Sequence, residues 1–281
     1  MKKFILLVLA FPNIVNAQWH VNLFGGISNY SGDLQSKFFT TDQSNAGLGL
    51  GLQYDVTPHI SVLSGINYGK VNAADKFNKP ELQLRNLSFQ SQIFEWNLTG
   101  EYNIFDISVK RFTPYGFAGV ALFHFNPYAY DTLGNKVFLR PLSTEGEGLA
   151  AYPERKQYSL IQLAIPFGGG IKIRITDNVI LAYEIAFRKL FTDYLDDVST
   201  TYVDRATLLS AKGPLAVEMA YRGDEVKGGN PNYPSSGTMR GNPKNKDWYY
   251  FTGIRISISI DNMVTMRMNK KGVIDCPKKV I

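Results

Sequence analysis

The sequence predicts an all-β fold, an eight-stranded antiparallel transmembrane β-barrel with long extracellular loops, short periplasmic turns and a periplasmic C-terminal tail. Apolar and polar residues alternate over eight segments, as in strands with one face toward lipid and one toward a filled interior. The connections between these segments alternate between long and short. Aromatic residues make up 13% of the 281 residues and charged residues only 19%, which suits rings that face an apolar medium.

The chain begins with the pattern of a secretory signal peptide, which we assign to residues 1–17. Lys2 and Lys3 precede the apolar run 4–11, and residues 15–17 read Val-Asn-Ala, a small-residue cleavage site. No later run approaches the roughly 20 apolar residues that a membrane-spanning helix needs. An exported chain of this kind would cross a membrane only as a closed barrel. We therefore expect it in the outer membrane.

The alternation is clearest in segment 88–104, where Phe94 and Trp96 share one face while Glu95 and Asn97 share the other. Seven further segments repeat the pattern, so we expect the barrel to occupy residues 18–260. The predicted strands are 19–30, 45–55, 59–71, 88–104, 113–125, 159–175, 179–188 and 248–260. The fifth of them puts four aromatic residues on one side, namely Tyr115, Phe117, Phe123 and Phe125.

The lengths of the connections support the same fold and orient it. The long connections are 31–44, 72–87, 126–158 and 189–247. The short ones are 56–58, 105–112 and 176–178. Because such barrels have short turns on the periplasmic side, this alternation places both mature termini in the periplasm. Within the last loop, Asp204 to Tyr221 forms a helix-like stretch.

Charged residues fall on the inward side of several predicted strands. They are Glu95, Glu101, Lys172, Arg174, Glu184, Arg188 and Arg255. An eight-stranded barrel is just wide enough for its own side chains to fill. Buried unpaired charges are costly, so residues of opposite sign in one lumen should pair. We expect a plug of paired charges and no conducting pore.

Catalytic and cofactor signatures are absent from the sequence. His20, His59 and His124 have no metal-ligand spacing, and no G-x-S-x-G nucleophile elbow occurs. Cys276 is the only cysteine, which excludes an internal disulfide and a C-x-x-C pair. The net charge of +6 is modest and does not indicate nucleic acid. We predict no enzyme, no cofactor, no small-molecule substrate and no nucleic-acid partner.

Three loop motifs are rich in turn-forming residues and carboxylates: 28–34, 144–148 and 192–198. Two interpretations are open. Carboxylates from neighbouring loops would suit a hard cation such as Ca²⁺, although no EF-hand spacing is present. Alternatively, the motifs order the mouth of the barrel through hydrogen bonds to one another.

The segment 261–281 would be a basic tail in the periplasm. Its charges surround Cys276 and are Arg267, Lys270, Lys271, Lys278 and Lys279. We interpret them as a contact for a periplasmic partner, with an intermolecular disulfide through Cys276 as one form of that contact. A disordered end without a partner is the alternative.

Several motifs in order resemble the PorG-like family of Bacteroidota outer-membrane barrels. They are 28–34, 94–97, 114–127, 144–146, 165–170 and 191–198. The resemblance implies an outer-membrane component of the type IX secretion system, associated with the periplasmic ring of PorK and PorN that also serves gliding motility. It offers no catalytic residues. Glu147 departs from the family pattern, where Gln is expected.

These observations predict a non-enzymatic scaffold that anchors the secretion and motility machinery in the outer membrane. Its partners would be outer-membrane lipids and a periplasmic ring or lipoprotein, with Cys276 as a candidate disulfide link. A surface-binding barrel that acts through loop 189–247 is the alternative.

Overall fold

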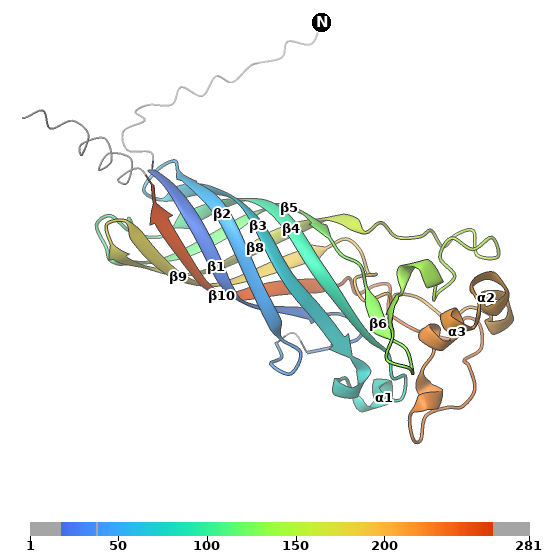
Figure 1. The fold of residues 1–281 in the computed structure, drawn as a ribbon. Helices are drawn as coiled ribbons and strands as arrows, with labels where there is room; N and C mark the ends of the chain where they lie inside the picture. Colours follow the sequence, from blue (N-terminus) through green and yellow to red (C-terminus); the bar gives the residue numbers. More distant parts are fainter. Residues whose placement is uncertain (1–17, 38, 261–281) are drawn as a thin grey trace, which may run out of the picture.

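The computed structural model describes residues 18–37 and 39–260, and eight long antiparallel strands dominate it (Figure 1). These strands are β1 Gln18–Ser31, β2 Asn45–Asp55, β3 Ile60–Ala74, β4 Ser88–Asn103, β5 Phe112–His124, β8 Ile161–Thr176, β9 Val179–Leu190 and β10 Trp248–Ser259. Their order in the sheet is β3-β2-β1-β10-β9-β8-β5-β4, and β3 also pairs with β4. That last pairing closes the sheet, so the chain is an all-β, closed, eight-stranded antiparallel barrel.

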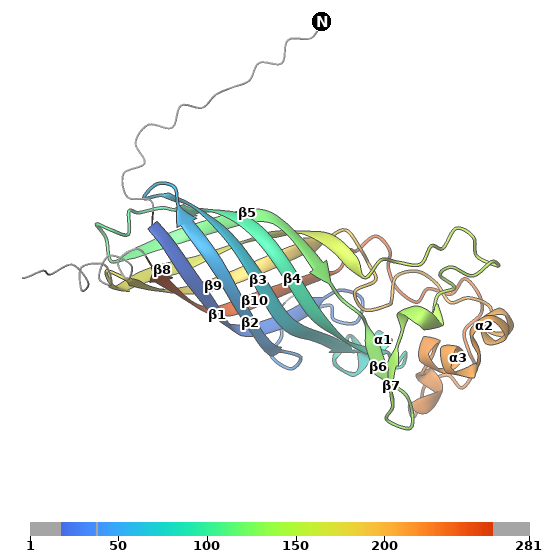
Figure 2. The ribbon, with the colours of Figure 1, turned by 45° about the horizontal axis from the view of Figure 1, so that its top comes forward.

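The remaining elements belong to the long loops. They are the 3-10 helices η1 Asp75–Phe77, η2 Arg140–Leu142 and η3 Gly223–Glu225, the helices α1 Pro80–Gln83, α2 Arg205–Lys212 and α3 Pro214–Ala220, and the strands β6 Tyr128–Tyr130 and β7 Lys136–Phe138. The hairpin of β6 and β7 extends the sheet at the end of β4, where Tyr128 pairs with Gln90 (Figure 2). Within the described residues, no helix is both long and apolar enough to cross a membrane.

All four long connections lie at one end of the barrel, and the three short turns lie at the other (Figure 1). We number the long connections as the first to fourth loops, namely 32–44, 75–87, 125–160 and 191–247. The short turns are 56–59, 104–111 and 177–178. His20 of β1 pairs with Ser259 of β10, so the described chain begins and ends at the rim that carries the short turns. We call the other end, with the long loops, the outer end.

The outer face of the barrel wall is apolar on every side. Leu50, Trp96 and Ile173, for example, keep 57%, 45% and 46% of their surface exposed. A continuous apolar band of this size is not stable against water, but it matches the hydrocarbon core of a bilayer. Because each strand pairs with a neighbour on both sides and the sheet has no free edge, the fold has the properties of a membrane-spanning barrel.

Strand β5 differs from its neighbours, because its aromatic side faces the interior. Tyr115, Phe123 and Phe125 are buried, while Val120 and Leu122 of the opposite side are exposed. Both sides of this strand are apolar, so alternation alone does not reveal which one faces lipid. Phe123 and Phe125, at and just after the end of β5, fill the outer part of the lumen, whereas Tyr115 lies nearer the short turns.

The helix-like stretch in the last loop is confirmed, but it forms two helices rather than one. Asp204 caps α2, because its side chain accepts a hydrogen bond from the Thr207 amide at 2.8 Å. The break follows from Gly213, which has a φ of 82°, and from Pro214, which begins α3. Glycine adopts this left-handed conformation without strain.

Candidate functional site

The lumen is crossed by a first ion-pair cluster in its outer half. The guanidinium of Arg188 donates from Nε and Nη2 to the two oxygens of Glu95, each at 2.8 Å. The Tyr249 hydroxyl donates to Glu95 Oε2 at 2.6 Å, and the side-chain amides of Asn67 and Asn97 donate to Oε1 at 2.8 and 3.0 Å. Each carboxylate oxygen therefore has two or three donors, which compensates for its loss of water.

A second cluster lies nearer the short turns. Glu101 forms ion pairs with both Lys172 and Arg255, and the Arg255 Nη2 atom lies 2.5 Å from Glu101 Oε2. Arg255 Nε also lies 3.3 Å from Glu184 Oε2, and the Tyr115 hydroxyl donates to the same oxygen at 2.7 Å. Two carboxylates and two cations are thus joined in one buried network, so their charges balance.

Seven charged residues were predicted to face the interior from the alternation along the strands. Six of them belong to these two clusters, but Arg174 does not. Arg174 lies near the end of β8, and its Nη1 is 3.9 Å from Asp177 in the turn 177–178. Its inward parity is correct, but the strand ends there. The Arg174 side chain therefore lies at the rim, and the prediction that it belongs to the lumen network is wrong.

A cavity of about 50 Å³ separates the two clusters. Arg188 and Asn97 line its outer side, and Arg255 and Glu184 line its inner side. Because one water molecule needs roughly 10–15 Å³ of such space, the cavity holds a few waters at most. Side chains and not an open channel therefore fill the lumen between the two clusters.

At the outer end, the three loop motifs meet and lock the third loop to the fourth. Glu145 accepts hydrogen bonds from the amides of Ser199 and Thr200 at 2.9 and 2.7 Å, and it pairs with Arg240 at 3.1 Å. Asp197 accepts a hydrogen bond from the Thr144 hydroxyl at 2.5 Å and another from the Tyr158 hydroxyl at 2.6 Å. The motif 144–148 thus holds the motif 192–198.

The first and second loops are joined to the same assembly. Arg85 pairs with Asp75 at 2.7 Å and donates to the Asp33 carbonyl at 3.2 Å. The amide of Asn242, in the fourth loop, donates to Asp33 Oδ2 at 2.8 Å. All four long loops therefore form one hydrogen-bonded unit, which we call the outer cap.

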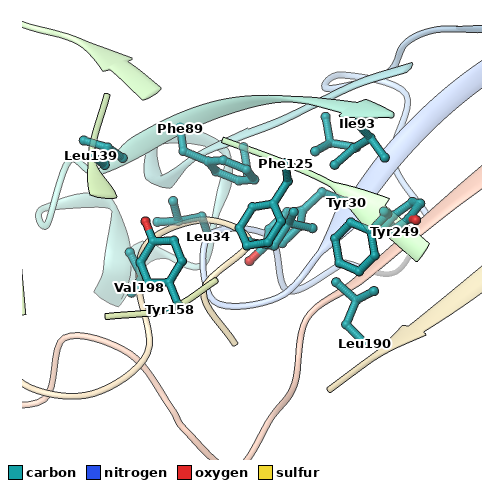
Figure 3. Close-up of a cluster of buried hydrophobic side chains, with 14 of the residues drawn as sticks. Tyr30, Leu34, Phe89, Ile93, Phe125, Leu139, Tyr158, Leu190, Val198 and Tyr249 are labelled. Carbon is teal, nitrogen blue, oxygen red and sulfur yellow. The ribbon is translucent and has the colours of Figure 1, made fainter. Parts of the chain in front are cut away.

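A hydrophobic cluster lies beneath the outer cap and seals the outer mouth of the lumen (Figure 3). It includes Tyr30, Leu34, Phe89, Ile93, Phe125, Leu139, Tyr158, Leu190, Val198 and Tyr249. These residues come from strand ends and from loops, so the cap and the wall share one core. The cap is consequently a folded part of the protein and not a set of independent loops.

The outer cap buries more carboxyl groups than cations. The Tyr30 hydroxyl lies 2.6 Å from Asp196 Oδ2 and 3.0 Å from Asp247 Oδ1. A hydroxyl has one hydrogen to donate, so at least one of these carboxyls must itself carry a proton to complete both hydrogen bonds. Burial and neighbouring carboxylates accordingly raise the pKa of Asp196 and of Asp247 well above the usual range.

Two other buried carboxyls have an oxygen without a hydrogen-bond partner, Oε1 of Glu147 and Oδ1 of Asp193. Burial raises the pKa of Glu147 to about 8 and that of Asp193 to about 7. Among residues 18–37 and 39–260, no group of three or more acidic, histidine or cysteine side chains has an arrangement that would hold a metal ion. The geometry favours the second interpretation of the motifs, in which they order the mouth through mutual hydrogen bonds.

Sequence reasoning missed several residues of the outer cap. Arg240 and Asp247 lie in an irregular run, and Tyr30 was included only as part of a motif. Arg85 and Asp75 also escaped notice, because they pair within the second loop and follow no strand alternation. A single arginine in a Gly-, Pro- and Asn-rich segment is the one local signal that would have directed attention to Arg240.

Other predicted site residues lie outside the described residues, so the structure does not test them. These are Arg267, Lys270, Lys271, Cys276, Lys278 and Lys279 of the predicted tail. The predicted signal peptide, 1–17, lies outside them as well.

Comparison with known proteins gives one family match and several solved structures to which the chain is similar. Residues 1–140 match a family described as a domain of unknown function, DUF6089. No curated protein matches the chain.

The solved structures to which the chain is similar include three bacterial proteins. Neisserial surface protein A is 10% identical, with 88% of this chain and 100% of that chain covered and a TM-score of 0.43. Ail, the attachment invasion locus protein of Yersinia pestis, is 7% identical, with the same coverages and a TM-score of 0.42. The outer membrane protein OprG from Pseudomonas aeruginosa is 12% identical, covering 87% and 98%, with a TM-score of 0.40.

Proposed function

We propose that this protein is a non-enzymatic scaffold in the outer membrane that anchors the type IX secretion and gliding machinery. The observation that carries the proposal is that the barrel is filled from end to end. Two ion-pair clusters occupy the lumen, and the outer cap with its hydrophobic cluster covers the outer mouth. A barrel with a filled lumen conducts no ions and transports no solutes, so we infer that its function is to hold other proteins at the membrane.

The resemblance to the PorG-like barrels supports the particular machinery. The motifs that carry it, 28–34, 144–146 and 191–198, supply contacts of the outer cap, for example Glu145 with Ser199. Glu95, in the motif 94–97, supplies the centre of the first lumen cluster. Motifs that build one sealed barrel favour a shared architecture, and from it we infer a shared role.

The outer-membrane location follows from the signal-peptide pattern together with the apolar outer wall. In that location, the rim with the short turns faces the periplasm. The segment 261–281 would then extend from β10 into the periplasm, where Cys276 and the basic residues Arg267, Lys270, Lys271, Lys278 and Lys279 would meet a periplasmic ring or lipoprotein of the PorK and PorN type.

The experiment is purification from native membranes in mild detergent without reductant, followed by identification of the co-purifying proteins. Wild type is compared with Cys276→Ser and with a chain that lacks residues 262–281. We expect a periplasmic ring or lipoprotein with the wild type, loss of any disulfide-linked species with Cys276→Ser, and loss of the complex with the truncated chain. A folded truncated barrel that still recovers the whole complex would refute docking through the tail.

A second candidate function is binding of a surface partner through loop 189–247. The observation that favours it is that this loop is folded, with α2 and α3 packed against the third loop around Val203 and Leu208. Protease treatment of intact cells tests this function. A loop that is cleaved in cells as fast as in the purified protein is free to bind from outside, whereas a loop protected only in cells is covered by a larger complex.

A further inference from the structure

A basic hollow of about 880 Å³ opens at the outer end of the barrel, where the wall meets the outer cap. Its lysines come from three parts of the chain, namely Lys79 of the second loop, Lys189 of β9, and Lys244 and Lys246 of the fourth loop. All four lysines are exposed to solvent. Their convergence depends on the fold, since they are far apart in the sequence.

The positive charge of this hollow is not neutralised by the protein. None of the four lysines has a carboxylate within ion-pair distance among the described residues. Arg85 and Arg240 also line it, but they are paired with Asp75 and Glu145. Asp33 is the one acidic residue of the lining. The hollow therefore fits an anionic group that brings its own negative charges.

A groove of about 410 Å³ lies on the outward face of the same wall, and its surface is mostly apolar although Lys37 and Asp42 of the first loop border it. Ile27 of β1, Thr252 of β10, and Tyr183 and Ile185 of β9 form its floor. Phe39 of the first loop stands over it, with its ring 5.6 Å from that of Tyr250. The first loop thus folds over the outside of the wall and makes a trough from a surface that would otherwise be flat.

The register of the strands relates the two features. Trp248 pairs with Ser31 and Lys189 in the row that lines the hollow, and Thr252 pairs with Ile27 and Ile185 in the row that floors the groove. The rows are four residues apart, which corresponds to about 13 Å along the strand. The hollow lies toward the outer cap, and the groove lies toward the middle of the wall.

An aromatic row lies between the hollow and the groove. Phe167, Phe187 and Tyr250 are paired across β8, β9 and β10, and the Trp248 ring lies 6.0 Å from that of Phe167. Aromatic girdles mark the depth at which headgroups meet acyl chains in outer-membrane barrels. The basic hollow is therefore at headgroup level, and the groove is at acyl-chain level.

We propose that this side of the barrel binds one phosphorylated lipid of the outer leaflet, with its phosphates among Lys79, Lys189, Lys244 and Lys246 and an acyl chain in the groove beneath Phe39. A free phosphate would use the hollow but not the groove, and a neutral lipid would use the groove but not the hollow. Only a lipid with an anionic headgroup uses both. This inference rests on the proposed outer-membrane location, but not on the secretion role.

The test uses purified full-length protein in detergent and diphosphorylated lipid A as the probe, with binding measured by native mass spectrometry and by titration. The hollow variant is Lys189→Ala with Lys244→Ala, and Phe39→Ala tests the groove. The matched control is Lys156→Ala with Lys227→Ala, which removes the same charge from exposed residues that line neither feature. Migration of the unheated and heated proteins on gels verifies that each variant is folded.

We expect one tightly held lipid on the wild type and on the control. The hollow variant should bind about 30-fold more weakly, which corresponds to about 1 kcal/mol for each lysine near an anionic surface. Phe39→Ala should also weaken binding of the lipid, and inorganic phosphate at millimolar concentration should not displace the lipid from the wild type. Equal affinity for the hollow variant and the control would overturn the proposal, as would displacement by phosphate alone. No secretion partner is present, so the result is independent of the tail-docking experiment.

Discussion

Glu95 and Arg188 meet across the lumen from strands β4 and β9, which are separated in the sheet by β5 and β8. Both side chains are buried, and two hydrogen bonds of 2.8 Å join them. The pair therefore ties opposite walls of the barrel together. It also closes the lumen just below the hydrophobic cluster of the outer mouth.

Removing one partner of this pair should be costly, because the other would remain as an uncompensated buried charge. We expect Arg188→Ala to lower the free energy of unfolding by about 3–5 kcal/mol. The double variant Glu95→Leu with Arg188→Met removes both charges and should recover most of that loss. Urea titration of the refolded barrel in detergent measures both. If the double variant were as unstable as Arg188→Ala, the loss of stability would come from losing the pair itself and not from the unpaired buried charge of Glu95.

The inner cluster makes a prediction about conduction. The wild type should show no steady ion conductance in a planar bilayer. Lys172→Ala with Arg255→Ala leaves Glu101 and Glu184 without their cations, so these carboxylates should draw in water and small cations. This variant should still pass no steady current, because the Glu95–Arg188 pair and the hydrophobic cluster still close the outer half of the lumen. Arg174→Ala, at the rim, is the control and should stay silent. A steady current through the wild type would contradict a filled lumen.

The two faces of a strand are predictable from sequence only where they differ in polarity. In β4, Phe94 and Trp96 face outward and Glu95 and Asn97 inward, as alternation predicts, because lipid excludes the polar side. In β5 both sides are apolar, so the inward position of Phe123 has no local signature. The ion pairs of the lumen are predictable because their strands, like β4, have one polar and one apolar face. A narrow interior then leaves the inward charges no partners other than one another.

The outer cap was much less predictable, because its contacts join residues that are distant in the sequence. The carboxylate of Glu145 and the guanidinium of Arg240 are 3.1 Å apart although 95 residues separate them. No periodicity links two such positions, and the turns between them have no repeating geometry. The motifs indicated that the loops are ordered, but the packing of all four loops on the shared hydrophobic cluster determines the partners.

The buried carboxyls of the outer cap should make it tighter in mild acid. Burial raises the pKa of Asp193 to about 7 and that of Asp197 to about 6. An unfolded carboxyl has a pKa near about 4. The contribution of the protonated groups to stability is therefore fully present below about pH 4 and is lost as the pH rises through 6 and 7.

Amide hydrogen exchange of residues 195–203, corrected for the intrinsic effect of pH, measures this change. We expect opening of the cap to be about 100-fold less frequent at pH 5.5 than at pH 8.5, because groups with a pKa of about 7 and about 6 together give about two pKa units of linkage between these pH values. Amides of β4 should show no such change. Asp193→Asn should make the profile less steep, because the pH dependence from Asp197 remains, and an unchanged profile in that variant would assign the pH dependence to other groups.

Glu145 and Glu147 are two residues apart, yet the same substitution should affect them in opposite ways. Glu145 pairs with Arg240 and accepts from the amides of Ser199 and Thr200. Glu145→Gln should therefore destabilise the outer cap by about 3 kcal/mol, because the buried Arg240 loses its anion. Glu147 instead has one unpartnered oxygen, and burial raises its pKa to about 8.

A neutral amide at position 147 can keep the one hydrogen bond that Glu147 makes, from the Glu145 amide to Oε2 at 3.1 Å. Glu147→Gln should thus leave the cap unchanged at pH 6 and stabilise it at pH 8.5, where the carboxyl would otherwise have to ionise in a buried place. Protection of the Ser199 and Thr200 amides from exchange measures both variants. If Glu147→Gln loosened these amides as much as Glu145→Gln does, Glu147 would have to act as an anion, and its unpartnered oxygen would then require a cation that neutralises it.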